Sequence, residues 1–188
     1  MDAIEIFFTA YGVLLALAVA KLLSSAARLI RARETIKLGW ATPLLMLLLL
    51  LEICSFLTNA SKIMGLADLS FGVVTNGIVA CGCYVLVASL VAPDDLAAWP
   101  DLDAYYDKHK PLVVGGMIVG SLMGFEVTSL LVRGFAESVQ VRWMGLHATL
   151  LLAFYSLIAA LFLIRNRAAN LVLLAMLNAI FVVVMFTF

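Results

Sequence analysis

Long uncharged runs recur along this chain and set its predicted architecture. Residues 69–93, 143–164 and 168–188 contain no Asp, Glu, Lys or Arg, and each is long enough to cross a hydrocarbon core. Three further apolar stretches are interrupted by only one or two charges. Because runs such as 44–51 do not alternate apolar with polar positions, the strands of a membrane barrel are excluded. The pattern predicts six transmembrane helices, at about residues 4–29, 41–63, 71–91, 111–132, 143–164 and 170–188.

Composition agrees with this pattern. The 188 residues are 65% hydrophobic and only 13% charged, with a mean hydropathy of +1.13. Soluble domains are about 45–50% apolar and about 25% charged, so the fold class is an all-α polytopic membrane protein. We expect one integral membrane domain over 1–188, with the lipid bilayer as its surroundings. The balance of 12 basic and 12 acidic residues argues against a nucleic-acid partner, and little chain remains for a separate catalytic domain.

Basic residues in the connections predict the orientation. Alternate connections carry eight of them on one side and three on the other. The eight are Arg28, Arg31, Arg33, Lys37, Lys108, Lys110, Arg165 and Arg167, and the three are Lys62, Arg133 and Arg142. Because cytoplasmic loops are enriched in Lys and Arg, both termini are expected outside. Since no basic region precedes the first span, we expect that span to be retained. A compact chain without targeting tails favours the bacterial inner (plasma) membrane.

The longest connection, 92–110, predicts a short helix lying in the membrane interface. Pro100 precedes the segment 101–109, in which Leu102, Tyr105, Tyr106 and His109 share one face. A metal site at Asp103, Asp107 and His109 is the alternative interpretation of this segment.

The two halves of the chain show similar spacings, which predict a 3+3 inverted repeat. Trp40 and Trp143 open the second span of each half, and Asn76 and Asn178 lie in the third spans at similar distances from them. Chance matches among few residue types are the alternative explanation.

Glu52 is the most informative polar residue, because a carboxyl near mid-membrane is costly unless it is paired, hydrated or functional. Ser55, Asn59 and Lys62 follow it at helical spacing, so the four share one face. This polar stripe lines either an outward-open cavity, with Glu52 as the ion- or proton-sensing group, or a packing seam. Lys21 is the candidate charge partner from the first span, and it either reaches toward Glu52 or extends to the inner headgroups.

Other polar residues are expected in the outer half of the membrane. Glu126 and His147 occupy similar depths in neighbouring spans, where they would form a proton relay or a buried hydrogen bond. Asn76 lies at comparable depth and Asn178 near the middle of the last span. These residues complete the predicted substrate- or ion-binding set of Glu52, Ser55, Asn59, Asn76, Glu126, His147 and Asn178.

Small residues predict close helix packing. Gly116, Gly120 and Gly124 recur every four residues, which removes side-chain bulk from one helix face. The contact lies either within one chain or between chains, so a homo-oligomer or a membrane-protein partner is expected.

Cofactor and metal motifs are absent from the sequence. Cys81 and Cys83 point about 200° apart on a helix, and His109 and His147 lie at opposite membrane sides. No phosphate loop, zinc-type spacing or nucleophile elbow occurs. We predict neither a cofactor nor a metal.

Three functions remain open from the sequence. The first is a small channel or transporter for an ion or small solute, with an outward-open polar cavity. The second is a non-catalytic subunit or scaffold of a larger membrane assembly. The third is an enzyme acting on lipid or quinone, which would use polar groups of segment 101–109.

Overall fold

The computed structural model describes residues 3–63, 70–142 and 145–187, and this part of the chain is helical with no strand. Five of its helical segments are long and apolar enough to cross a membrane, as expected for an integral membrane protein. They are Thr9–Ala32, Ala41–Ser61, Phe71–Leu90, Leu102–Arg133 and Arg167–Phe186. The predicted span at 143–164 corresponds to a shorter apolar helix, Ala148–Leu163, so a sixth crossing is not established.

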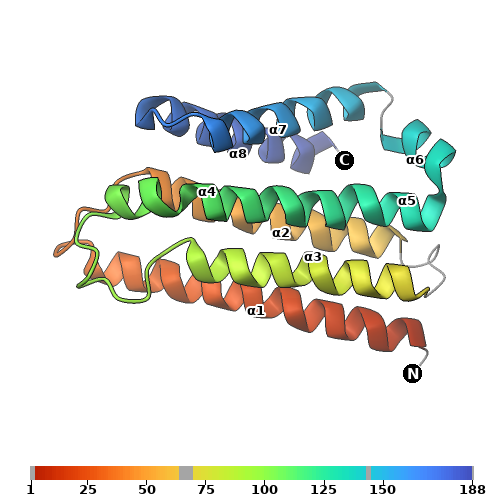
Figure 1. Cartoon of the computed structure of the whole chain (residues 1–188), viewed down its shortest axis with the longest axis horizontal. Coiled ribbons are helices and arrows are strands. Elements are labelled where there is room, and N and C mark those ends of the chain that lie inside the picture. The colour runs from red at the N-terminus through yellow and green to blue at the C-terminus, as the bar shows by residue number, and fades with distance from the viewer. Residues whose placement is uncertain (1–2, 64–69, 143–144, 188) are drawn as a thin grey trace.

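The helices follow one another in antiparallel order (Figure 1). Their bounds are α1 Ala3–Ala32, α2 Ala41–Ile63, α3 Phe71–Leu90, α4 Leu102–Ser121, the π-helical turn η1 Leu122–Val127, α5 Thr128–Arg133, α6 Phe135–Arg142, α7 Gly145–Leu163 and α8 Arg167–Thr187. In Figure 1, α1 and α3 form one side, α2 and the α4–α5 rod lie in the middle, and the α7–α8 hairpin covers the other side. This rod, which consists of α4, η1 and α5, therefore lies between α3 and α7.

The helix contacts do not repeat between the two halves. In the first half, the first and third helices, α1 and α3, pack along each other. In the second half the third helix, α8, packs instead on α2 and α7. The predicted inverted repeat is therefore not reproduced in the packing of the described helices.

The predicted separation of an interfacial helix 101–109 from a span 111–132 is wrong. Asp101 caps a single helix by accepting hydrogen bonds from the backbone of Asp103 (2.9 Å) and Ala104 (3.3 Å). The helix then runs through Pro111, since the buried side chains of Leu102, Tyr105 and Tyr106 anchor its first turns in the core. Proline usually breaks a helix, so core packing outweighs the local preference here. The 32 residues of Leu102–Arg133 extend roughly 48 Å at 1.5 Å per residue, more than a hydrocarbon core requires.

Two of the connections expected in the cytoplasm are joined by their backbones. The amide of Lys37 donates to the carbonyl of Pro100 at 2.8 Å, and the amide of Leu102 donates to the carbonyl of Lys37 at 3.0 Å. Lys110 on α4 donates its ammonium group to the carbonyl of Ile164, at the end of α7. The connection after α7 is thereby tied to α4 at the same end of the bundle as the other two connections.

Candidate functional site

The carboxyl of Glu52 lies where three helices meet, and it has no solvent exposure. The hydroxyl of Tyr84 on α3 donates to Oε1 of Glu52 at 3.2 Å, and the hydroxyl of Ser121 on α4 is its second polar neighbour. Oε2 has no partner at hydrogen-bonding distance among the described residues. A buried carboxyl oxygen without a partner carries a desolvation cost.

This burial corrects the prediction of an open cavity. Glu52 does not face a water-filled pocket in this conformation, since its side chain is fully enclosed. Ser55 and Asn59 on the same stripe are half-buried. The side chain of Lys62 lies outside the described residues.

Aromatic rings pack around Phe56 next to Tyr84, the hydrogen-bond donor to Glu52. The ring of Phe56, one turn beyond Glu52, lies 5.2 Å between centroids from Tyr84 and 5.2 Å from Tyr11 on α1. Phe125 on η1 makes an edge contact with Phe56 at 5.6 Å. Such tilted and edge-on pairs contribute beyond their buried area, so these rings form a packed wall that includes Tyr84, the partner of Glu52.

The π-helical turn η1 lies beside this wall and is held by a side-chain amide. Asn76 on α3 donates through Nδ2 to the carbonyl of Met123 and to Oγ1 of Thr128, both at 2.9 Å. The Thr128 hydroxyl donates to the same Met123 carbonyl at 2.9 Å. Asn76, predicted as a cavity-lining residue, thus adds a side-chain donor to a carbonyl that also accepts the Thr128 amide across the π-turn. π-Turns inside helices occur frequently at functional sites.

Glu126 belongs to the same turn and forms a second pair of a carboxyl with a tyrosine. Tyr155 on α7 donates its hydroxyl to Oε1 of Glu126 at 3.2 Å, and both residues are half-buried. The side chain of His147 lies outside the described residues, so the predicted contact between Glu126 and His147 stays a prediction.

Asn178 holds a packing seam between α8 and α2. Its amide donates to the carbonyls of Leu44 at 3.1 Å and Leu174 at 2.7 Å. These contacts lie away from the Glu52 carboxyl, so the structure does not place Asn178 with the other predicted site residues.

Lys21 does not pair with Glu52, which corrects one of the two predicted roles. Its ammonium group binds Asp94 at 2.9 Å, in the connection after α3, and Arg28 binds the same carboxylate at 3.0 Å. Hydrogen bonds from Lys21 and Arg28 hold the pKa of Asp94 below its usual value of 3.8. The 91–101 connection folds back over α1 and supplies a partner that the depth of Lys21 along its span did not reveal.

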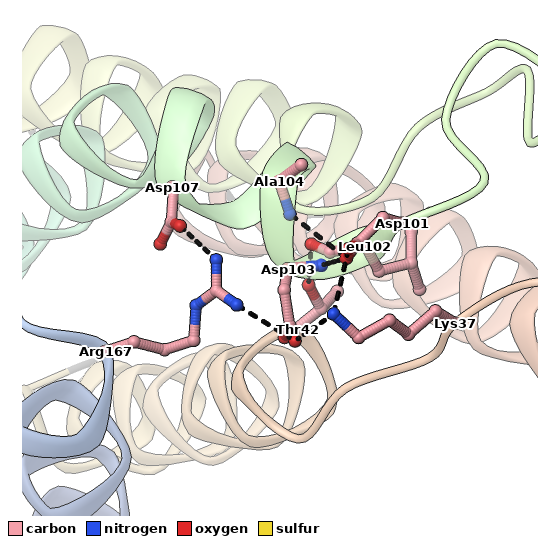
Figure 2. Close-up of polar contacts among 8 residues, drawn as sticks. All are labelled: Lys37, Thr42, Asp101, Leu102, Asp103, Ala104, Asp107 and Arg167. Atoms are coloured by element: carbon pink, nitrogen blue, oxygen red, sulfur yellow. Dashed lines mark hydrogen bonds and ion pairs between the residues drawn. The ribbon is translucent and has the colours of Figure 1, made fainter.

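A larger group of ion pairs gathers at the same end of the bundle (Figure 2). Arg167 at the start of α8 reaches Asp103 at 3.3 Å and also Asp107, while Lys37 binds Asp101 at 2.9 Å and Asp103 at 3.6 Å. The hydrogen bond from Lys37 lowers the pKa of Asp101. These contacts tie α8 and the 33–40 connection to the beginning of α4. They replace the alternative interpretation of Asp103 and Asp107 as metal ligands.

The glycine stripe is used within the chain. An added Cβ would lie 2.5 Å from the side chain of Val87 at Gly116, and 2.2 Å from the ring of Phe56 at Gly124. Gly120 faces Tyr84 at 3.4 Å. These glycines bring α4 and η1 against α3 and α2, so the stripe gives no support for a contact between chains.

Sequence reasoning did not identify Tyr84 or Ser121 as neighbours of Glu52. Tyr84 is the only tyrosine in the uncharged run 69–93, which was the available signal. Comparison with known protein families, with curated proteins and with solved structures finds no match.

Proposed function

We propose that this protein is a small membrane transporter for an ion or small solute, and that the structure represents an occluded state. The observation that carries the proposal is the enclosed Glu52 carboxyl, which joins α2, α3 and α4 and keeps one oxygen without a partner. Ionisable groups inside membrane helices are rare, and they mark ion and substrate pathways and proton relays. Sealing on both sides fits a transporter that alternates its access better than a continuously open channel.

The alternative of a scaffold subunit loses its main support. The glycine stripe packs inside the chain, and Lys21 has Asp94 as its partner. Two of the features that suggested an absent partner protein, the glycine stripe and the charge of Lys21, thus have partners within the chain.

Flux through reconstituted vesicles tests the proposal. Purified protein is placed in liposomes, and the movement of protons, rubidium and chloride is recorded along with swelling in glycerol. At least one probe should move in wild-type vesicles, and Glu52→Gln should slow it by about tenfold or more. Glu137→Gln is the matched control, because Glu137 is exposed on α6 and forms an ion pair with Arg133. Vesicles in which no probe moves would refute the proposal, as would a Glu52→Gln variant as fast as wild type.

The proposed orientation places the linked connections 33–40, 91–101 and 164–166 in the cytoplasm of a bacterium. Eight basic residues on that side against three on the other support it. A membrane-impermeant maleimide applied to intact cells should label Ala136→Cys on α6 and spare Thr35→Cys, with the unmodified chain as the blank. The reverse labelling would overturn the orientation without affecting the transport proposal.

A further inference from the structure

The surroundings of the Glu52 carboxyl suit a neutral acid. Its side chain has no solvent exposure, Tyr84 donates to Oε1 at 3.2 Å, and Ser121 is the other polar neighbour. Both neighbours are uncharged hydroxyls. A carboxylate sealed from water without a cation is far more costly than a neutral carboxyl, so the closed bundle holds Glu52 with its proton.

The basic residues that form ion pairs in the described part of the chain pair with other acids. Lys21 and Arg28 bind Asp94, Lys37 and Arg167 bind carboxylates at the start of α4, and Arg133 binds Glu137. Glu52 takes part in none of these pairs. In the closed bundle its neutrality therefore depends on the proton.

Loss of that proton would leave the carboxylate short of hydrogen-bond donors. A carboxylate accepts about four hydrogen bonds, whereas Tyr84 and Ser121 supply two hydroxyls and Oε2 has no partner. Water is the donor that remains. Ser55 and Asn59, half-buried on the same face of α2, provide a polar route for water toward Oε2. Ionisation therefore favours a state in which α2 parts from α3 and α4 far enough to admit water.

We infer that ionisation of Glu52 is the switch that opens the occluded state; this inference rests on the proposed transport function. The O–H bond of the acid breaks, its proton passes to an entering water molecule, and water then donates to the carboxylate. Return of a proton from water restores the neutral carboxyl, and the bundle closes over it. The bundle is thus closed in acid and open in alkali.

Other titratable side chains lie on the helices that pack against α2. They include Tyr11 on α1, Cys81 and Tyr84 on α3, those of 103–110 on α4, Glu126 on η1 and Arg167 on α8. Tyr84 bonds the Glu52 carboxyl, whereas Lys110, the last of the α4 group, lies roughly 16 Å along the helix axis from Ser121. Because these groups also respond to pH, the test compares Glu52 with a neutral glutamine at the same pH.

A thiol placed beside Glu52 reports the opening. Ser121→Cys is made in a chain carrying Cys54→Ala, Cys81→Ala and Cys83→Ala, because Ser121 is 1% exposed in the closed bundle. Labelling by a small methanethiosulfonate in micelles is timed at about pH 6 and about pH 10, a range that ionises even a buried carboxyl. Ionisation of the thiol also speeds labelling, so each rate is divided by that of the same reporter with Glu52→Gln.

This ratio should be near one at the lower pH and about tenfold or more at the higher pH. The reporter with Glu137→Gln is the matched control and should label as fast as its parent, since Glu137 is exposed on α6. A ratio near one at both pH values would overturn the switch.

If the reporter chains fail to fold, two measurements on the wild type replace them. The infrared carbonyl band of a protonated carboxyl is followed over the same pH range, together with amide deuterium exchange corrected for its intrinsic pH dependence. Loss of the band together with faster exchange supports the switch. A band that persists to about pH 10, or one that is lost without faster exchange, overturns it.

Failure of the switch and failure of transport are distinguishable, because the labelling needs no gradient. Vesicles that move a probe, combined with labelling that does not depend on Glu52, would refute the switch and leave transport standing. Opening that depends on Glu52 in a protein that moves no probe would refute transport alone.

Discussion

Replacing Gly124 by alanine probes the packing that encloses the site. The added methyl group would lie 2.2, 2.7 and 2.8 Å from three carbons of the Phe56 ring. The ring has little room to retreat, because Phe56 is 1% exposed and contacts Tyr11, Tyr84 and Phe125 at 5.2–5.6 Å between centroids. The substitution therefore forces either the ring or η1 to shift.

The expected cost follows from two opposing effects. Overpacking a well-filled core costs about 1–3 kcal/mol. Alanine regains at most about 1 kcal/mol over glycine in a helix. The difference of these effects is a fall of about 0–2 kcal/mol in the free energy of unfolding, and the 2.2 Å approach to the Phe56 ring favours the upper end.

Gly82→Ala is the matched control, because an added Cβ at Gly82 in α3 meets nothing within 4 Å. Both variants are unfolded in mixed micelles by titration with dodecyl sulfate and followed by tryptophan fluorescence. Gly124→Ala should unfold at a lower dodecyl sulfate fraction than wild type, and Gly82→Ala should not. Equal midpoints for the two variants would show that Phe56 is free to move, and the reasoning from tight packing would be refuted.

Two further substitutions test contacts described above. Asn76→Leu removes one of the donors to the Met123 carbonyl, so the same titration should show a loss of about 0.5–1.5 kcal/mol, the net worth of one hydrogen bond; an unchanged midpoint would contradict the role of Asn76 at η1. Asp94→Asn removes the carboxylate shared by Lys21 and Arg28, and these two lower the pKa of Asp94 below 3.8 in the folded protein. A carboxyl whose pKa is lowered by folding adds stability at every pH above its unfolded-state pKa of 3.8. The melting-temperature difference between wild type and variant should therefore stay constant from neutral pH down to about 3.8 and then decline as the folded carboxyl is protonated. A difference that disappears at neutral pH would contradict the pairing.

The helical fold could be predicted from the sequence because each membrane span is a continuous run of apolar residues. Charge-free runs located α3 and α8 with little error, since insertion into hydrocarbon depends on each segment separately. The boundary at Pro111 was wrong for the opposite reason. Burial of Tyr105 and Tyr106 depends on neighbouring helices, and no local pattern reports it.

Glu52, the central residue of the candidate site, could be predicted from the sequence, but the residues that contact it could not. Glu52 stands out because a carboxyl in an apolar run is costly wherever it points. Its contact with Tyr84 depends on how α2 and α3 are rotated toward each other, which spacing within one helix does not encode. The pairing of Lys21 with Asp94 likewise depends on the path of a connection distant in sequence.

The π-turn at 122–127 gives the α4–α5 rod an unusual tolerance to shortening. Deleting one residue from an ordinary helix rotates everything beyond it by about 100°. A π-turn already contains one residue more than a regular turn, so its loss would return η1 to plain α-helix and leave α5 facing as it does now. The Met123 carbonyl, which now accepts the Thr128 amide across the π-turn, would then accept an amide four residues on, as in a regular α-helix. Shortening η1 by one residue is thus expected to keep the same face of α5 against α3.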